Sequence, residues 1–349
     1  MPRVKASVCF LIYAWYVLAI ASGQVRQTEN ILREQVRSRP ASFQTNHALG
    51  EFYIQQHNLI AAIPYLEKAR QLDPSNYENA YDLALACLQT GATAKSREVI
   101  AALLDVKDRG ELHNLLGDVE EAEGHVEAAA KQYEIAARMD PSEKHLLDLG
   151  SDLLRHRGFE PALKVFVFAT QRYPQSPKLR VGLGIAYYSL GQYDDAVESL
   201  CRAVDLDPTD TKALDFLGKM HDVSEQFAGE VTKRLALFVK IYPDNAAANY
   251  YYALSLRTGS RGSQAEAETH LVRAVKLNPA YTEAHYELGL LYEDGGQDAK
   301  AVQEFQLAIK TRSDFSKAHY HLGRLYQKHG QPALAQKELD AFEALKAKR

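Results

Sequence analysis

The chain has 349 residues, of which 46% are hydrophobic and 25% are charged; these proportions exclude wholesale disorder and a protein made mostly of membrane spans. The formal net charge of -4 disfavours a general nucleic-acid binder, because such proteins carry an excess of basic residues. Three cysteines are too few for a disulfide framework or a cysteine-rich zinc module.

The N-terminus has the pattern of an export signal. Arg3 and Lys5 precede an apolar run over residues 6–21, and the stretch 19–23 offers two cleavage sites between small residues. The run is shorter than the roughly 20 residues that span a bilayer, which favours cleavage. We therefore predict a signal peptide over residues 1–23 and an exported chain, periplasmic or secreted. The alternative is an uncleaved membrane anchor over residues 6–21.

Residues 24–42 are polar and contain several arginines. Ile31, Leu32 and Val36 are spaced for one weak helical face, which Pro40 would end. We interpret this segment as a linker or a short capping helix.

From Phe43 onward the chain repeats itself, and the clearest marker is a leucine followed by a small residue. This pair occurs at Leu49-Gly50, Leu83-Ala84, Leu116-Gly117, Leu149-Gly150, Leu183-Gly184, Leu217-Gly218, Leu288-Gly289 and Leu322-Gly323, with Tyr252-Ala253 in the remaining place. Successive markers are 33 to 36 residues apart, so residues 43–349 hold about nine units. A fixed period of this size predicts a solenoid.

The spacing inside a unit predicts two helices. In the fifth unit, Leu183, Gly184 and Tyr187 share one helical stripe, and Ala196, Leu200 and Ala203 share another. Gly191-Gln192 separates the two stripes, and Asp207-Pro208 ends the second. A glycine inside a helix costs about 1 kcal/mol relative to alanine, yet seven units have one after the marker residue. We therefore expect the two helices of each hairpin to pack closely at that glycine.

These marks resemble the tetratricopeptide repeat, a 34-residue helix–turn–helix with Leu-Gly, a following Tyr, later Ala and aromatic positions, and a closing Pro. The resemblance covers residues 43–349 and implies an all-α fold, a right-handed α-solenoid of about nine helical hairpins. Three units depart from the pattern: the second has Ser96, Ile100 and Leu103 and no closing proline, the sixth needs a one-residue slip to reach Leu235 and Pro243, and the seventh carries an insertion around Gly259 to Ser263.

The sequence shows no catalytic pattern. Numbered from the first residue of each unit, slot 4 holds His113, His285 and His319 in three units, which we interpret as a semi-buried packing position and not as a metal site. The recurring Leu-Asp-Pro is explained as a turn before the next hairpin. No phosphate-binding loop, His-Glu-x-x-His or Gly-x-Ser-x-Gly occurs. We expect no enzyme activity, no cofactor and no metal.

The resemblance implies that slots 2, 5, 9, 12 and 13 of each first helix line the concave surface. Their charges differ along the chain. The first three units contribute Glu51, Glu78, Glu111, Asp118 and Glu121; the middle three contribute Lys144, Arg155, Lys178, Lys212 and Lys219 against Asp215 and Asp222; the last three mix both signs. Five tyrosines lie at these slots, and tyrosine is common at binding hot spots.

We therefore predict a non-catalytic scaffold that binds a peptide or protein segment in this groove, in the cell envelope. The predicted groove residues are Tyr81, Arg155, Tyr188, Lys219, Tyr250, Arg257, Tyr286, Tyr320 and Arg324. One alternative is a helical-repeat RNA binder similar to pentatricopeptide proteins, although net charge and leader oppose a nucleic-acid partner. Another is a self-assembling scaffold, a homodimer joined by the apolar edge of the final helix at Ala335, Leu339, Phe342 and Leu345.

Overall fold

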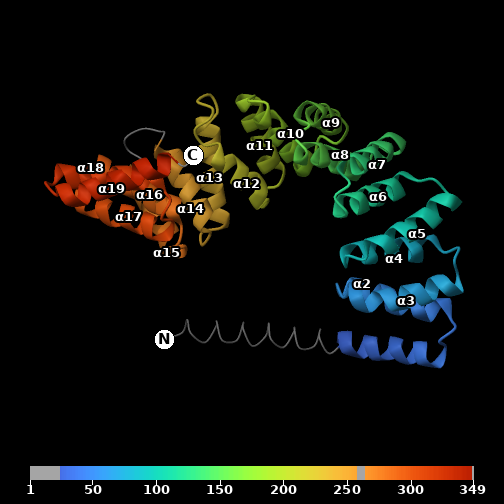
Figure 1. Cartoon of the computed structure of the whole chain (residues 1–349). Coiled ribbons are helices and arrows are strands. Elements are labelled where there is room, and N and C mark those ends of the chain that lie inside the picture. The colour runs from blue at the N-terminus through green and yellow to red at the C-terminus, as the bar shows by residue number, and fades with distance from the viewer. Residues whose placement is uncertain (1–23, 258–263, 348–349) are drawn as a thin grey trace, which may run out of the picture. The chain divides into compact units, whose positions relative to one another are not determined.

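The computed structural model describes residues 24–257 and 264–347 (Figure 1). All the regular secondary structure in these two ranges is helical, and no helix within them is long and apolar enough to cross a membrane. The predicted leader (residues 1–23) and the insertion around Gly259 to Ser263 lie outside the described residues. The chain forms two compact units, one ending at Asp152 and the other beginning at Leu153.

The helices follow one another in pairs, which confirms the predicted all-α solenoid of hairpins. The first unit contains a helix over residues 24–38, then α2 (Phe43–Gln55), α3 (Leu59–Leu72), α4 (Tyr77–Gln89), α5 (Thr93–Val106), α6 (Gly110–Ala122), α7 (Val126–Met139) and most of α8 (Glu143–Arg155). The second unit contains α9 (Phe159–Arg172), α10 (Pro177–Ser189), α11 (Tyr193–Leu206), α12 (Thr211–Lys219), α13 (Ala228–Ile241), α14 (Ala246–Arg257), α15 (Gln264–Leu277), α16 (Thr282–Asp294), α17 (Asp298–Thr311), α18 (Ser316–Lys328) and α19 (Pro332–Lys346).

The turn inside a hairpin needs one residue in the left-handed backbone region. That residue is slot 15 of the unit: Gly91, Gly124, Gly191, Gly296 and Gly330 occupy it with φ between 66° and 82°, and His57 and Arg157 occupy it with φ of 54° and 61°. Glycine adopts this conformation without steric cost. The predicted break at Gly191 is therefore confirmed.

The slot-8 glycines lie where the two helices of one hairpin meet. Five of them face a large side chain sixteen residues later on the second helix: Gly50 faces Leu66, Gly117 faces Tyr133, Gly184 faces Leu200, Gly289 faces Phe305 and Gly323 faces Leu339. A Cβ atom on these glycines would lie 2.5 to 2.9 Å from the facing side chain, closer than van der Waals contact allows. The predicted close packing is confirmed for these hairpins, and in all of them except the last the glycine makes room for a large residue that lies between two alanines.

The helix over residues 24–38 packs against the first hairpin. Its Val25, Leu32 and Val36 contact the core of the first unit. The hydroxyl of Tyr53 accepts a hydrogen bond from Arg33 Nε at 2.9 Å and donates one to Glu29 at 2.8 Å. This segment, which the sequence left open as linker or capping helix, covers apolar surface of the hairpin α2–α3.

The sixth hairpin is irregular, as its register in the sequence suggested. Its first helix, α12, ends at Lys219 after nine residues, whereas α10 has thirteen. Its second helix buries Val231 and Phe238 where a regular unit has alanines. Gly218 consequently faces Tyr251 of α14, in the next hairpin, and not a residue of α13.

Candidate functional site

The predicted groove residues lie on the first helices of the hairpins, a surface that we call the first-helix face. Tyr81 of α4 belongs to the first unit. Arg155 is exposed at the end of α8. The remaining predicted residues, Tyr188, Lys219, Tyr250, Arg257, Tyr286, Tyr320 and Arg324, all belong to the second unit. The structure therefore concentrates the predicted site there.

In the first unit, several of the predicted acidic groups are already bound by neighbouring side chains. Tyr77 donates a hydrogen bond to Glu111 at 2.5 Å, and Tyr133 donates one to Asp118 at 2.8 Å. Tyr81 is half-buried and stacks on Tyr77, with ring centroids 6.0 Å apart. The acidic end of the groove is therefore less available to a partner than the sequence suggested.

Tyr286 needs correction as a groove residue, because its side chain is only 8% exposed. Its ring packs against Phe305 and Phe315, with centroids 5.8 and 5.1 Å apart. Tyr250, at the same slot one hairpin earlier, is half-buried against Tyr281, at 4.9 Å. Tyr286 therefore belongs to the hydrophobic core, and Tyr250 offers a partner only part of its ring.

Two predicted tyrosines remain open to solvent. Tyr188 is 48% exposed and Tyr320 is 37% exposed. The guanidinium carbon of Arg324 lies 5.8 Å from the Tyr320 ring centroid. Tyr320 also contacts Phe342 of α19, with ring centroids 5.2 Å apart. Phe342, Leu339, which faces Gly323, and the buried Ala335 all belong to the predicted dimer edge and already pack within their own hairpin.

Arg257 is bound within the second unit. Its guanidinium pairs with Glu287 of α16 and lies 3.5 Å from Asp294. Glu287, at slot 6, was missed by the sequence analysis, which considered only slots 2, 5, 9, 12 and 13. Burial raises the pKa of its carboxyl group, and Arg257 opposes that shift. Arg257 therefore ties α14 to α16, and binding a partner through it would first require breaking this pair.

Lys219 and Tyr188 line the same cavity, of about 100 Å³, between α10 and α12. The other lining residues are Gly184, Ile185, Leu200, Phe216 and Met220. Phe216 and Met220 lie at slots 6 and 10, which the sequence analysis left out. The sequence could have indicated these two residues only through their apolar side chains, which flank the predicted groove residue Lys219.

The slot-4 histidines make polar contacts that the packing interpretation missed. The two ring nitrogens of His285 lie 2.7 Å from a Glu304 carboxylate oxygen and 3.1 Å from the Pro279 carbonyl oxygen. His319 repeats this arrangement with Glu338 and Ser313, at 2.6 and 3.0 Å. Because both neighbours of the His285 ring are acceptors, both of its ring nitrogens must donate, which favours the charged imidazolium of His285.

Asparagine makes part of the same contact in other hairpins. At slot 4, Asn46 donates to the Pro40 carbonyl and Asn249 to the Pro243 carbonyl, both at 3.0 Å. Slot 4 thus supplies a donor to the carbonyl six residues earlier, at the start of the hairpin.

We expect the free energy of unfolding to contain a pH-dependent contribution from His285. Burial alone would lower the pKa of its imidazole, but the hydrogen bonds to Glu304 and Pro279 raise it above its usual 6.5. With a raised pKa, the folded state holds the proton of His285 more tightly than the unfolded state does, so protonation stabilises the fold. This stabilisation is complete below pH 6.5 and is lost as the pH rises through the folded-state pKa. Between pH 6 and 8, the wild type should lose about 1 kcal/mol, the size of one hydrogen bond, relative to His285→Asn.

Asparagine is the matched replacement, since it keeps the donor to Pro279 and does not titrate. Urea unfolding of both chains at several pH values measures the difference. Parallel pH profiles would show that His285 carries no such contribution.

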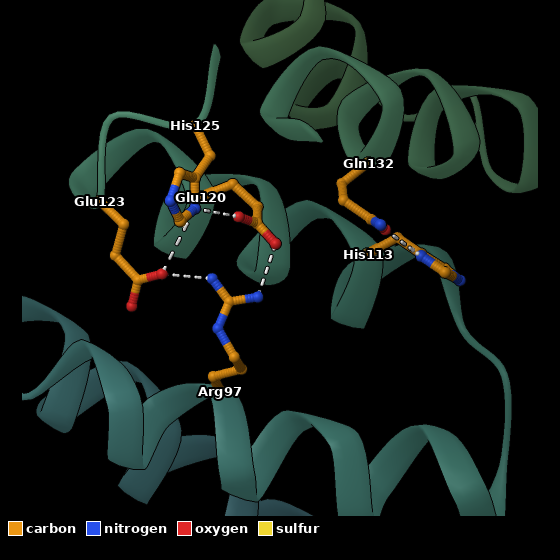
Figure 2. A network of polar contacts seen from close by, with 6 residues as sticks. All are labelled: Arg97, His113, Glu120, Glu123, His125 and Gln132. Atoms are coloured by element: carbon orange, nitrogen blue, oxygen red, sulfur yellow. Dashed lines mark hydrogen bonds and ion pairs between the residues drawn. The ribbon is translucent and has the colours of Figure 1, made fainter. Parts of the chain in front are cut away.

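A second polar cluster joins two hairpins of the first unit (Figure 2). Arg97 of α5 donates to Glu120 and Glu123 at the end of α6, both at 2.5 Å. His125 Nδ1 lies 2.9 Å from Glu120. The ligand atoms of Glu120, Glu123 and His125 lie within 4.8 Å of one another, close enough to hold a metal ion. The Arg97 guanidinium bridges the two carboxylates and already supplies the positive charge that a cation would bring.

Family models agree with this architecture. Models described as tetratricopeptide repeat match residues 53–119, 147–211 and 260–316, more than half of the chain. The chain is a tetratricopeptide repeat protein. Proteins of this family are in general scaffolds for protein–protein interaction, and that coarse role applies here.

Several curated proteins are similar to parts of this tetratricopeptide repeat protein. The Protein CTR9 homolog of Arabidopsis thaliana is 30% identical over 136 residues, which cover 38% of this chain and 12% of that protein. The BBSome complex member BBS4 of Bos taurus is 24% identical over 234 residues, which cover 64% of this chain and 43% of that protein. The chain thus spans less than half the length of each of these relatives.

Two solved structures are similar to parts of this chain. The crystal structure of MamA is 25% identical, with 48% of this chain and 95% of that chain covered and a TM-score of 0.41. A tetratricopeptide repeat protein from Parabacteroides merdae is 15% identical, with 68% and 93% covered and a TM-score of 0.52. At 15% identity, the likeness to the Parabacteroides merdae structure concerns the fold alone.

Proposed function

We propose that the chain is a scaffold of the cell envelope that binds a segment of a partner protein along the first-helix face of its second unit. The envelope location rests on the sequence, where Arg3 and Lys5 precede an apolar run that ends in small residues. The binding surface rests on the side chains that the second unit leaves open.

One observation carries the choice of surface. At two places on this face an exposed tyrosine lies beside a cation that pairs with no described carboxylate: Tyr188 with Lys219, and Tyr320 with Arg324. Tyrosine provides a large contact area and a hydroxyl group at low entropic cost, and an arginine or a lysine adds a charged donor for a carboxylate or a carbonyl of the partner. A protein segment carries the backbone and side-chain groups that can hydrogen-bond to both the tyrosine hydroxyl and the cation.

We expect the double variant Tyr188→Ala/Tyr320→Ala to bind the native partner at least about 30-fold more weakly, which corresponds to a hot-spot loss of about 2 kcal/mol. The partner is captured from the envelope fraction of the native cells with the wild-type chain, identified, and titrated calorimetrically against each variant. Tyr286 is left intact, because replacing this core residue would test stability and not binding.

Phe168→Ala is the matched control, since Phe168 is an exposed aromatic residue, 49% accessible, on the second helix α9. This variant should bind like the wild type. Equal affinities for all three chains would contradict the proposed surface.

The envelope location predicts a processed chain. Mass spectrometry of the protein from fractionated native cells should find a mature N-terminus after Ala21 or Gly23, in the envelope or secreted fraction. A cytosolic protein that still begins at Met1 would contradict this part of the proposal.

A further inference from the structure

The cavity between α10 and α12 is built from apolar groups. Of its lining residues, Gly184, Leu200 and Met220 are buried, Ile185 and Phe216 are half-buried, and only Tyr188 and Lys219 are exposed. The hydroxyl of Tyr188 and the ammonium of Lys219 are the polar side-chain groups of this lining. An apolar group that enters the cavity therefore leaves water without displacing any hydrogen bond of the walls.

The size of the cavity limits its occupant. Sites for small molecules usually enclose about 300 to 1,000 Å³, and this cavity measures about 100 Å³. It suits a single side chain. Burying such a side chain contributes about 1.5 to 3 kcal/mol, enough to anchor one point of a longer segment.

The charge around the cavity indicates what lies next to that side chain. Lys178, Lys212 and Lys219 are exposed on α10 and α12, and none pairs with a described carboxylate. The Lys219 ammonium rests 5.5 Å from the Phe216 ring centroid, directly beside the cavity. Two carboxylates lie on the same face: Asp222 is exposed just after α12, and Asp215 is half-buried on α12. Burial raises the pKa of the Asp215 carboxyl group, and the charge of Lys219 opposes that shift. With three lysines against these two carboxylates, this stretch of the first-helix face keeps a net positive charge and complements an acidic segment.

We propose that this cavity receives one large apolar side chain, such as leucine, methionine or phenylalanine, of an acidic partner segment, and that Lys219 binds a carboxylate adjacent to it. The inference rests on the proposed function and narrows the partner to a chemical class. A nucleic acid fits this place less well, because apart from the Tyr188 hydroxyl and the Lys219 ammonium the side chains of the lining are apolar and cannot hydrogen-bond to base edges.

The test uses the full chain and defined synthetic peptides. One series of twelve-residue peptides has a central leucine, methionine, phenylalanine, alanine or glycine flanked by aspartate and glutamate; a second series has lysine and arginine flanks. Each peptide carries a fluorophore, and its Kd is measured by anisotropy. We expect the acidic leucine, methionine or phenylalanine peptides to bind at least tenfold more tightly than the alanine and glycine peptides. The basic series should bind more weakly throughout.

Two variants assign the effect to the cavity. Lys219→Glu should weaken the acidic leucine peptide at least tenfold and strengthen the basic leucine peptide. Ile185→Trp should fill the cavity and abolish the preference for leucine over alanine. Lys233→Glu is the control for net charge, because Lys233 is exposed on α13; its affinities should stay within twofold of the wild type. Circular dichroism verifies that each variant is folded.

Several results would overturn the inference: no binding by any peptide, equal affinity for leucine and alanine peptides, or equal effects of the two lysine substitutions. Displacement of the peptide by single-stranded RNA at stoichiometric concentration would assign the face to a nucleic acid. The native partner separates this inference from the proposed function. If Tyr188→Ala/Tyr320→Ala weakens that partner and Lys219→Glu does not, the binding face stands and the cavity assignment fails.

Discussion

Replacing Gly218 with alanine is expected to lower the free energy of unfolding by about 2 kcal/mol, within the range for overpacking a core. Helix propensity alone predicts the opposite sign, since alanine is favoured over glycine by about 1 kcal/mol inside a helix. At this position the new Cβ would lie 2.3 Å from Tyr251 Cγ and 2.8 Å from Tyr251 Cβ. These atoms are at the root of the tyrosine side chain, so relief requires α14 itself to move.

Gly229→Ala is the matched control. Gly229 also lies in a helix, α13, and a Cβ atom there would meet no other atom within 4 Å. That variant should gain up to about 1 kcal/mol, because alanine restricts the unfolded chain. Urea unfolding of both variants measures the two effects. Stabilisation by both substitutions would show that α12 and α14 are less tightly packed than the structure has them.

Replacing Arg97 with methionine is expected to cost about 2 kcal/mol of unfolding free energy, within the range for losing a hydrogen bond to a charged group. The side chain of Glu120 is only 10% exposed, and Arg97 is its strongest partner (Figure 2). Methionine keeps most of the aliphatic length of Arg97 and removes the guanidinium. The estimate stays below that for a fully buried pair, because the Arg97 side chain itself is 36% exposed.

Arg138→Met is the control for the same substitution at an exposed pair. Arg138 pairs with Glu134 within α7 at 2.6 Å, and both side chains are mostly exposed, so its loss should cost no more than about 0.5 kcal/mol. Chemical unfolding at pH 7 compares the two variants. Equal costs would show that the Arg97 cluster contributes nothing beyond a surface pair.

At acidic pH, the wild type and Arg97→Met should differ less in their free energy of unfolding than they do at pH 7. The hydrogen bond from Arg97 lowers the pKa of Glu120 below its usual 4.5, although burial opposes this. With a lowered pKa, the ionised Glu120 carboxylate stabilises the folded state. This stabilisation is complete above about pH 4.5 and is lost as the pH falls through the folded-state pKa. Unfolding curves at decreasing pH follow this change.

The helical hairpins could be predicted because their determinants are close together in the chain. Gly184 and its contact Leu200 belong to one hairpin and are sixteen residues apart, so each unit repeats the same local pattern. The same reasoning failed at Gly218, whose contact Tyr251 lies in the next hairpin. There α12 is short, and the regular pairing inside the hairpin is lost.

The binding residues could be predicted only in part. Tyr286 and Tyr320 occupy the same slot of successive hairpins, and the sequence treats them as equivalent. Phe305 and Phe315 pack around the ring of Tyr286, whereas Tyr320 keeps part of its ring exposed. Exposure of a slot therefore depends on the side chains that neighbouring helices bring to it.

By itself, the sequence determined the repeat period, the helical hairpin and the membership in a family of interaction scaffolds, because these depend on patterns within about 34 residues. Only the tertiary structure decided which tyrosines remain open, which charges are already paired, and that Tyr188 and Lys219 share one cavity. Those properties depend on contacts between hairpins, where side chains about 30 residues apart pack against one another. A pattern that repeats within each hairpin does not specify these contacts.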